Sequence, residues 1–89
     1  MNNNDLKLFA ATLRTDLLTL DLHGCHLDQA REEIDLFLSR ALVQGETVAK
    51  IIYGGGTGRL RDVVVGYLQT NQLVATIEEQ GGHCLILLT

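Results

Sequence analysis

The chain has 89 residues, 46% of them hydrophobic, which predicts one folded domain with a small core and argues against disorder. It carries 7 Lys and Arg against 11 Asp and Glu, so its net charge of −4 lacks the strongly basic balance typical of nucleic-acid-binding proteins. No apolar run approaches the roughly 20 residues that span a membrane, and the N-terminus is not a signal peptide, so we expect a cytoplasmic chain with no membrane partner and free thiols at its two cysteines.

Residues 1–16 are expected to form an N-terminal arm or short helix ahead of the domain. Four apolar side chains fall at i, i+3, i+4 and i+7, on one face of a helix: Leu6, Phe9, Ala10 and Leu13. Because so short a helix is marginal alone, we expect this face to pack on the domain. Binding to a partner is the alternative.

Two strands and a long helix are predicted next. In residues 17–22 leucines alternate with Thr19 and Asp21, which is typical of a strand with one buried face. Residues 27–43 carry apolar side chains at spacings of three and four, which predicts an amphipathic helix that Gly45 terminates. Residues 47–53 are rich in β-branched side chains and predict a second strand.

A second helix and a hairpin are predicted in the rest of the chain. Apolar residues fall at helical spacing after a glycine-rich loop: Leu60, Val63, Val64, Tyr67 and Leu68. Residues 73–77 and 83–88 are apolar runs joined by a turn with Gly81 and Gly82, which predicts an antiparallel pair. The order β-α-β-α-β-β predicts an α/β fold with a four-stranded mixed sheet, mostly parallel, under two main helices.

The glycine-rich loop has four glycines in five positions: Gly54, Gly55, Gly56 and Gly58. A glycine turn that opens a helix presents free N–H groups and a positive dipole end, which is typical of an anion site, usually for phosphate. The spacing fits neither a P-loop nor the motif Gly-x-Gly-x-x-Gly. Phosphate binding is favoured over a turn that binds nothing, because a plain turn needs fewer glycines.

Hydrogen-bond donors and cations flank this loop. Thr57 can donate to a phosphate oxygen, and Arg59 and Arg61 can pair with one. Lys50 is expected to add to the same basic patch. A solvated helix face explains the two arginines equally well.

A carboxylate and an imidazole lie two residues apart at the end of the first strand. Asp21 and His23 are expected to point to the same face, where the carboxylate can fix the tautomer of the imidazole. Such a pair can act as a general base or bind a metal, and a polar pair without chemistry is the alternative. Parallel neighbouring strands would place it beside the glycine loop, at the sheet edge where ligands of α/β folds bind.

Zinc binding and cysteine catalysis are disfavoured. His23, Cys25 and His26 form one short cluster, but structural zinc sites usually pair two such clusters. The other candidates, His83 and Cys84, begin a strand that is expected to be buried. We therefore expect no protein-held metal site, and a Mg²⁺ cofactor stays open.

Two motifs together resemble one known family. LDLHG at residues 20–24 and IIYGGGTGRLR at residues 51–61 are similar to motifs of the Smr domain, the small MutS-related domain, which occurs alone and at the C-terminus of MutS2 proteins. The likeness covers about residues 18–88, so we expect the Smr-like domain over residues 17–89. It implies a two-layer α/β sandwich similar to the C-terminal domain of translation initiation factor 3.

The resemblance also implies a nuclease that nicks DNA or cleaves RNA. In that family the Asp-Leu-His motif, here Asp21 and His23, is implicated in cleavage. The glycine motif, here residues 54–58, resembles the adjacent nucleic-acid-binding loop. The choice between DNA and RNA, the oligomeric state, and a larger MutS-like or ribosome-associated context all stay open.

One position departs from the family. The family usually has His-Gly where this chain has Tyr53-Gly54, and a phenol with a pKa of about 10 cannot do the proton work of an imidazole at neutral pH. Tyr53 can instead stack on a base or donate a hydrogen bond to phosphate. Three functions therefore remain: an endonuclease, a nucleic-acid-binding module with weak or no activity, and a protein-interaction domain.

Overall fold

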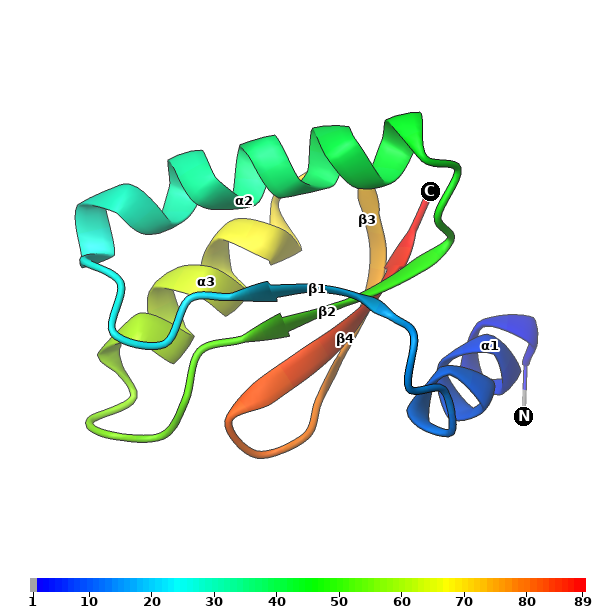
Figure 1. Ribbon diagram of the computed structural model, residues 1–89. Helices are drawn as coiled ribbons and strands as arrows, with labels where there is room; N and C mark the ends of the chain where they lie inside the picture. Colours follow the sequence, from blue (N-terminus) through cyan, green and yellow to red (C-terminus); the bar gives the residue numbers. More distant parts are fainter. Residues whose placement is uncertain (1) are drawn as a thin grey trace.

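The computed structural model describes residues 2–89, which form three helices and a four-stranded sheet (Figure 1). The elements in chain order are α1 (Asn3–Thr12), β1 (Leu18–Asp21), α2 (Leu27–Val43), β2 (Val48–Ile52), α3 (Arg59–Gln69), β3 (Val74–Glu79) and β4 (His83–Leu88). The strands lie in the order β1-β2-β4-β3. None of the helices in this described part of the chain is long and apolar enough to cross a membrane.

The sheet is mixed as predicted, but it is not mostly parallel. β1 and β2 pair in parallel, with Leu20 opposite Ile51, whereas β4 pairs antiparallel with both β2 and β3. The reason is that the hairpin inserts β4 between β3 and β2, so two of the three pairings are antiparallel. The one parallel pair still brings the loops after β1 and β2 to the same edge of the sheet (Figure 1).

The main core lies on one face of the sheet. α2 and α3 cover this face side by side, as Figure 1 shows. They bury Ile34, Phe37 and Leu68 against Ile51 and Ile86 of the sheet. Each such side chain contributes roughly 1.5–3 kcal/mol on burial. The packing of α2 and α3 on one face of the sheet confirms the two-layer α/β fold predicted for residues 17–89.

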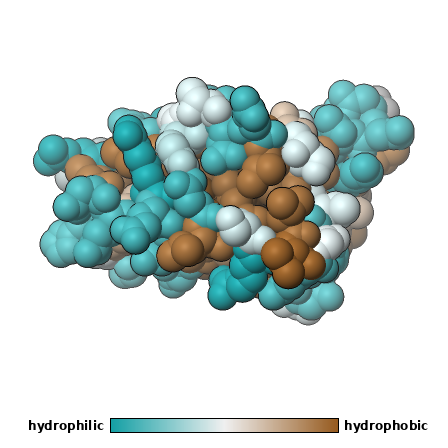
Figure 2. Space-filling model, turned by 90° about the horizontal axis from the view of Figure 1, so that it is seen from above, coloured by the Kyte–Doolittle hydropathy of each residue, from teal (hydrophilic) through white to brown (hydrophobic). Residues whose placement is uncertain are grey.

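The outer side of α2 carries both polar and apolar side chains. Figure 2 looks onto this side of the molecule and shows brown, hydrophobic residues gathered among teal, hydrophilic ones. The exposed large apolar residues of α2 are Leu27, Leu36, Leu42 and Val43. They do not contribute to the core, so the folding of the domain rests on the inner side of this helix.

α1 packs on the opposite face of the sheet, but not with the predicted side. Leu8 and Ala11 are buried against β2 and β4. The predicted stripe faces water instead, because Leu6 is 52%, Phe9 58% and Leu13 73% exposed. Leu8 and Ala11 also lie three apart on one helical face, and the small Ala11 lets the helix backbone approach the sheet closely. The packed helix is therefore confirmed, and its predicted face is wrong.

Candidate functional site

The glycine-rich loop, residues 54–58, follows Tyr53 and leads from β2 into α3 with a backbone that glycine adopts most easily. Gly54, Gly56 and Gly58 have φ angles of +77°, +65° and +83°, all in the left-handed region. Gly58 directly precedes α3, whose first N–H groups and positive dipole end face the loop. Gly55 has neither a positive φ nor a neighbour within 4 Å of the place a Cβ would take. Backbone shape therefore requires three of the four glycines.

The imidazole of His23 lies directly against this loop. A Cβ on Gly54 would come within 3.0 Å of His23 Cδ2, so a larger residue there would displace the ring. His23 stands at the corner of a tight turn after β1, in which the Cys25 N–H donates to the Leu22 carbonyl at 2.8 Å. Gly24 completes the turn with φ +79°. The two sequence motifs thus meet at the sheet edge, as the parallel pairing of β1 and β2 predicts.

Asp21 supports the turn through the backbone of His23. Asp21 Oδ1 accepts a hydrogen bond from the His23 backbone N–H at 2.9 Å. The sequence predicts a contact with the imidazole instead. The difference arises because β1 ends at Asp21 and the chain then turns, so the two side chains no longer share one face of a strand. Asp21 therefore positions His23 and does not fix its tautomer.

His23 and the glycine loop line one open groove of about 290 Å³. Cys25, Thr57 and Arg59 complete its walls. Arg59 is exposed and forms no ion pair within residues 2–89. An imidazole, backbone N–H groups and a guanidinium in one groove suit an anion such as phosphate.

Arg61 is held in ion pairs, unlike Arg59. Its Nε donates to Glu79 at 2.7 Å, and a terminal nitrogen donates to Asp62 at 2.8 Å. Hydrogen bonds to these carboxylates raise the pKa of Arg61, and the guanidinium lowers the pKa of Glu79. The arginine expected to bind phosphate is therefore already paired. Sequence reasoning missed Glu79, because it lies 18 residues away and no local pattern links the two.

Tyr53 is buried beneath the loop. The residue is 5% exposed, and its hydroxyl donates to Glu79 Oε1 at 3.2 Å and to the His83 carbonyl at 3.1 Å. Burial, more than the nearby Cys84 and Glu79, raises the pKa of Tyr53 to about 12. The side chain continues the core-facing alternation of β2, and the residue also borders the groove that His23 lines, so stacking on a base stays a prediction. The phenol hydroxyl is bonded within the protein.

Lys50 lies on the other face of the sheet from the core. It alternates with Ala49 and Ile51, which are both core residues, and it sits opposite Leu85, which packs against α1. It does not line the groove of His23 and Arg59. Lys50 therefore does not join the basic patch predicted for it and the two arginines, whereas both arginines border the glycine loop.

Metal ligands are sparse around the groove. Within residues 2–89, no three His, Cys, Asp or Glu side chains come together as ligands. Asp21 supplies one carboxylate, and a Mg²⁺ ion there would need phosphate oxygens to complete its coordination. Cys25 lines the groove, whereas Cys84 is a core residue, and its burial raises the pKa of the thiol to about 12.

Sequence comparison identifies the family. The profile of the Smr domain matches residues 20–85. Endonuclease MutS2 of Streptococcus thermophilus is 39% identical over 59 residues, which are 66% of this chain and 8% of that protein. Endonuclease MutS2 of Streptococcus pneumoniae is 42% identical over 74 residues, or 79% of this chain and 10% of that protein. The chain thus spans about a tenth or less of these relatives' length.

Solved structures share the fold. The Smr domain of Thermus thermophilus MutS2 superimposes with a TM-score of 0.78 at 24% identity, over 82% of this chain and 99% of that one. YdaL, a stand-alone small MutS-related protein from Escherichia coli, gives a TM-score of 0.75 at 19% identity, over 99% of this chain and 76% of that one. With the profile match over most of its length, the chain belongs to the Smr domain family.

Proposed function

We propose that this chain is a nucleic-acid-binding Smr domain of the endonuclease type, which nicks DNA or cleaves RNA. The contact between the His23 ring and Gly54 carries the proposal, because it joins the two family motifs in one groove. Relatives named endonuclease MutS2 support the reaction class. A cytoplasmic location and a larger MutS-like or ribosome-associated context belong to the same proposal.

The glycine loop and Arg59 bind a backbone phosphate in this proposal. The N–H groups at the start of α3 donate to the phosphate oxygens, and the guanidinium pairs with their charge. Thr57 Oγ1 accepts the Arg59 N–H at 3.4 Å, so its own O–H is available to donate to the same anion. The phosphate then sits beside the His23 ring.

His23 acts as the general base on this bound phosphate. Its ring takes a proton from water on DNA, or from the adjacent 2′-hydroxyl on RNA, and the resulting oxygen attacks the phosphorus and displaces the leaving oxygen. Asp21 is a positioning residue, because it holds the His23 backbone and not its ring. A positioned base contributes about 10²-fold to 10⁴-fold in rate, so we expect His23→Ala to remove most of the cleavage.

Binding without cleavage is the second candidate, and the state of Tyr53 favours it. The family usually has a histidine at this position. The phenol is buried, and its raised pKa of about 12 keeps it protonated at neutral pH. A site that needs two imidazoles would therefore bind nucleic acid here and leave it intact.

The deciding experiment incubates the chain with supercoiled plasmid and with structured RNA, each with and without Mg²⁺. We expect His23→Ala to remove most of the cleavage and to retain binding, and Arg59→Ala to weaken binding. His26→Ala is the matched control, because His26 is exposed, precedes α2 and makes no side-chain capping bond.

The outcomes separate the candidates. Cleavage that survives His23→Ala would contradict the role of His23. Binding without cleavage by the wild type selects the second candidate. No binding to either polymer would contradict both and leave a protein-interaction domain.

A further inference from the structure

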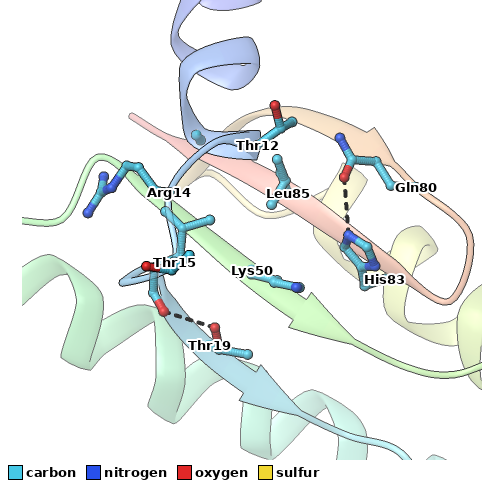
Figure 3. Close-up of a pocket in the computed structure, with 10 residues that line it drawn as sticks. Thr12, Arg14, Thr15, Thr19, Lys50, Gln80, His83 and Leu85 are labelled. Carbon is cyan, nitrogen blue, oxygen red and sulfur yellow. Dashed lines mark hydrogen bonds between the residues drawn. The ribbon is translucent and has the colours of Figure 1, made fainter.

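A second polar groove lies on the sheet face that α1 only partly covers. It has a volume of about 260 Å³ and is bounded by the C-terminal end of α1, the segment after it, and the exposed parts of β1, β2 and β4 (Figure 3). Lys50 and Leu85 form its floor, as expected for opposed residues of β2 and β4. The site described above does not include this groove.

The lining of this groove is cationic in an acidic protein. Arg14 and Lys50 line it, with the imidazole of His83, whereas no Asp or Glu of residues 2–89 does so. The whole chain carries 11 acidic residues and a net charge of −4, so Lys50, which forms no ion pair within residues 2–89, gives this groove a positive charge against the global sign. Asp16, which does not line the groove, pairs with Arg14 Nε at 2.9 Å. The terminal nitrogens of Arg14 form no ion pair within residues 2–89.

Lys50 is the principal donor in the groove. Figure 3 shows its amine extended over the floor toward the His83 ring. Lys50 forms no ion pair within residues 2–89. The hydroxyls of Thr12 and Thr19 already donate to backbone carbonyls, at 2.6 and 2.9 Å. His83 Nε2 is likewise engaged, with Gln80 Oε1 at 3.1 Å.

The groove adjoins the candidate site along β1. Thr19 lines the groove, and Asp21 lies two residues further on the same face of the strand, about 6.6 Å along it. Asp21 in turn sits opposite Ile52, which sits opposite His83. The two grooves therefore border the same strands, and a polymer that occupies both has to pass the Asp21 carboxylate to reach Lys50.

We propose that this groove binds the phosphate backbone of a single-stranded segment that flanks the nucleotide at the glycine loop. The inference rests on the proposed function and names the strand's path. The path bends from the sheet edge onto the sheet face within a few nucleotides. A duplex, with a persistence length of about 150 bp, resists such a bend, whereas a single strand follows it. Lys50 and Arg14 then act as phosphate contacts outside the reacting centre.

The test measures the binding of labelled single-stranded oligonucleotides to the full chain. One probe of about 4 nucleotides can fill only the glycine-loop groove, and one of about 16 can cover both grooves. We expect Lys50→Gln to lower the affinity for the long probe on the order of tenfold at low salt and to leave the affinity for the short probe unchanged. For the long probe, the slope of log affinity against log salt concentration should become shallower by about 0.7 in this variant.

Controls keep the result interpretable. Lys7→Gln removes the other lysine, which is exposed on α1 and does not line the groove, and should change neither probe. Arg14→Gln should repeat the length dependence of Lys50→Gln, and it guards against a folding defect at the half-buried Lys50. Arg59→Ala should lower the affinity for both probes.

Two results would overturn the inference. If Arg59→Ala weakens binding while Lys50→Gln and Arg14→Gln behave like Lys7→Gln, the groove binds no nucleic acid and the proposed function stands. If the wild type binds neither probe, both proposals fail.

Discussion

Gly54 determines whether the candidate site can form. Its φ of +77° strains any L side chain, and a Cβ would lie 3.0 Å from His23 Cδ2. We expect Gly54→Ala to lower the free energy of unfolding by roughly 1–3 kcal/mol and to displace the His23 ring. Urea unfolding measures the first effect, and the imidazole NMR signals report the second.

Gly55 provides the matched control for this prediction. It has no positive φ, and open space surrounds the place of its Cβ. Gly55→Ala should therefore stay within about 0.5 kcal/mol of the wild type and leave the His23 signals unchanged. Equal losses in the two variants would mean that loop glycines matter for reasons other than φ and the His23 contact.

Tyr53 makes a prediction at high pH. Its folded-state pKa is raised to about 12 by burial, above the ordinary 10 of the unfolded chain. The unfolded chain therefore loses this proton first as the pH rises from 10 to 12. The contribution of Tyr53 to stability is complete below pH 10 and should fall by up to about 1.4 kcal/mol per pH unit across this window. Unfolding midpoints in urea at several pH values measure the slope.

Tyr53→Phe isolates this effect. The variant removes the titrating proton, so the fall in stability above pH 10 should become shallower than in the wild type. It also removes the donor to Glu79 and the His83 carbonyl, which should cost about 1 kcal/mol at neutral pH. An unchanged slope above pH 10 would show that other groups cause the alkaline loss.

Among the elements, α1 tests which side of a short helix carries its packing. Leu8 is buried against the sheet, whereas Phe9 is 58% exposed. We expect Leu8→Ala to lower the free energy of unfolding by about 2–3 kcal/mol, because it leaves a cavity between α1 and the sheet. Phe9→Ala should change it by less than about 0.5 kcal/mol. A large loss of unfolding free energy in Phe9→Ala would show instead that α1 packs with the face that the sequence pattern predicts.

The loop and the hairpin behave as one unit at this scale. The N–H groups of Tyr53 and Gly54 both donate to the Gly82 carbonyl, at 3.0 and 2.8 Å. The pair of Arg61 and Glu79 adds a second link, between α3 and β3. The candidate site is therefore built on four strands and a helix, although its recognisable motifs come from only two loops.

For the whole molecule, local patterns predict most of the fold and the central pair of the site. Periodicity gives the helices and strands, and the parallel pairing of β1 and β2 brings His23 to Gly54. The side of α1 is not predictable in this way, because two apolar stripes compete and the sheet selects between them. The pairing of Arg61 with Glu79 depends on a contact across the fold. The place of Lys50 could have been predicted from the sequence. Strand alternation puts Lys50 and Tyr53, three residues apart, on opposite faces of the sheet, so a core-facing Tyr53 places Lys50 on the other face.

The net charge of −4 leads to a last prediction, on association with nucleic acid. Glu32 and Glu33 are exposed on α2 and line neither groove. Glu32→Gln with Glu33→Gln removes two negative charges, from −4 to −2, and should speed association about twofold at low salt by weakening long-range repulsion. At about 1 M salt the Debye length is roughly 3 Å, so the difference should vanish. Stopped-flow binding measures the association rates of the variant and the wild type at both salt concentrations. A faster rate in the variant that persists at high salt would mean that the two glutamates act through a direct contact with nucleic acid and not through long-range repulsion.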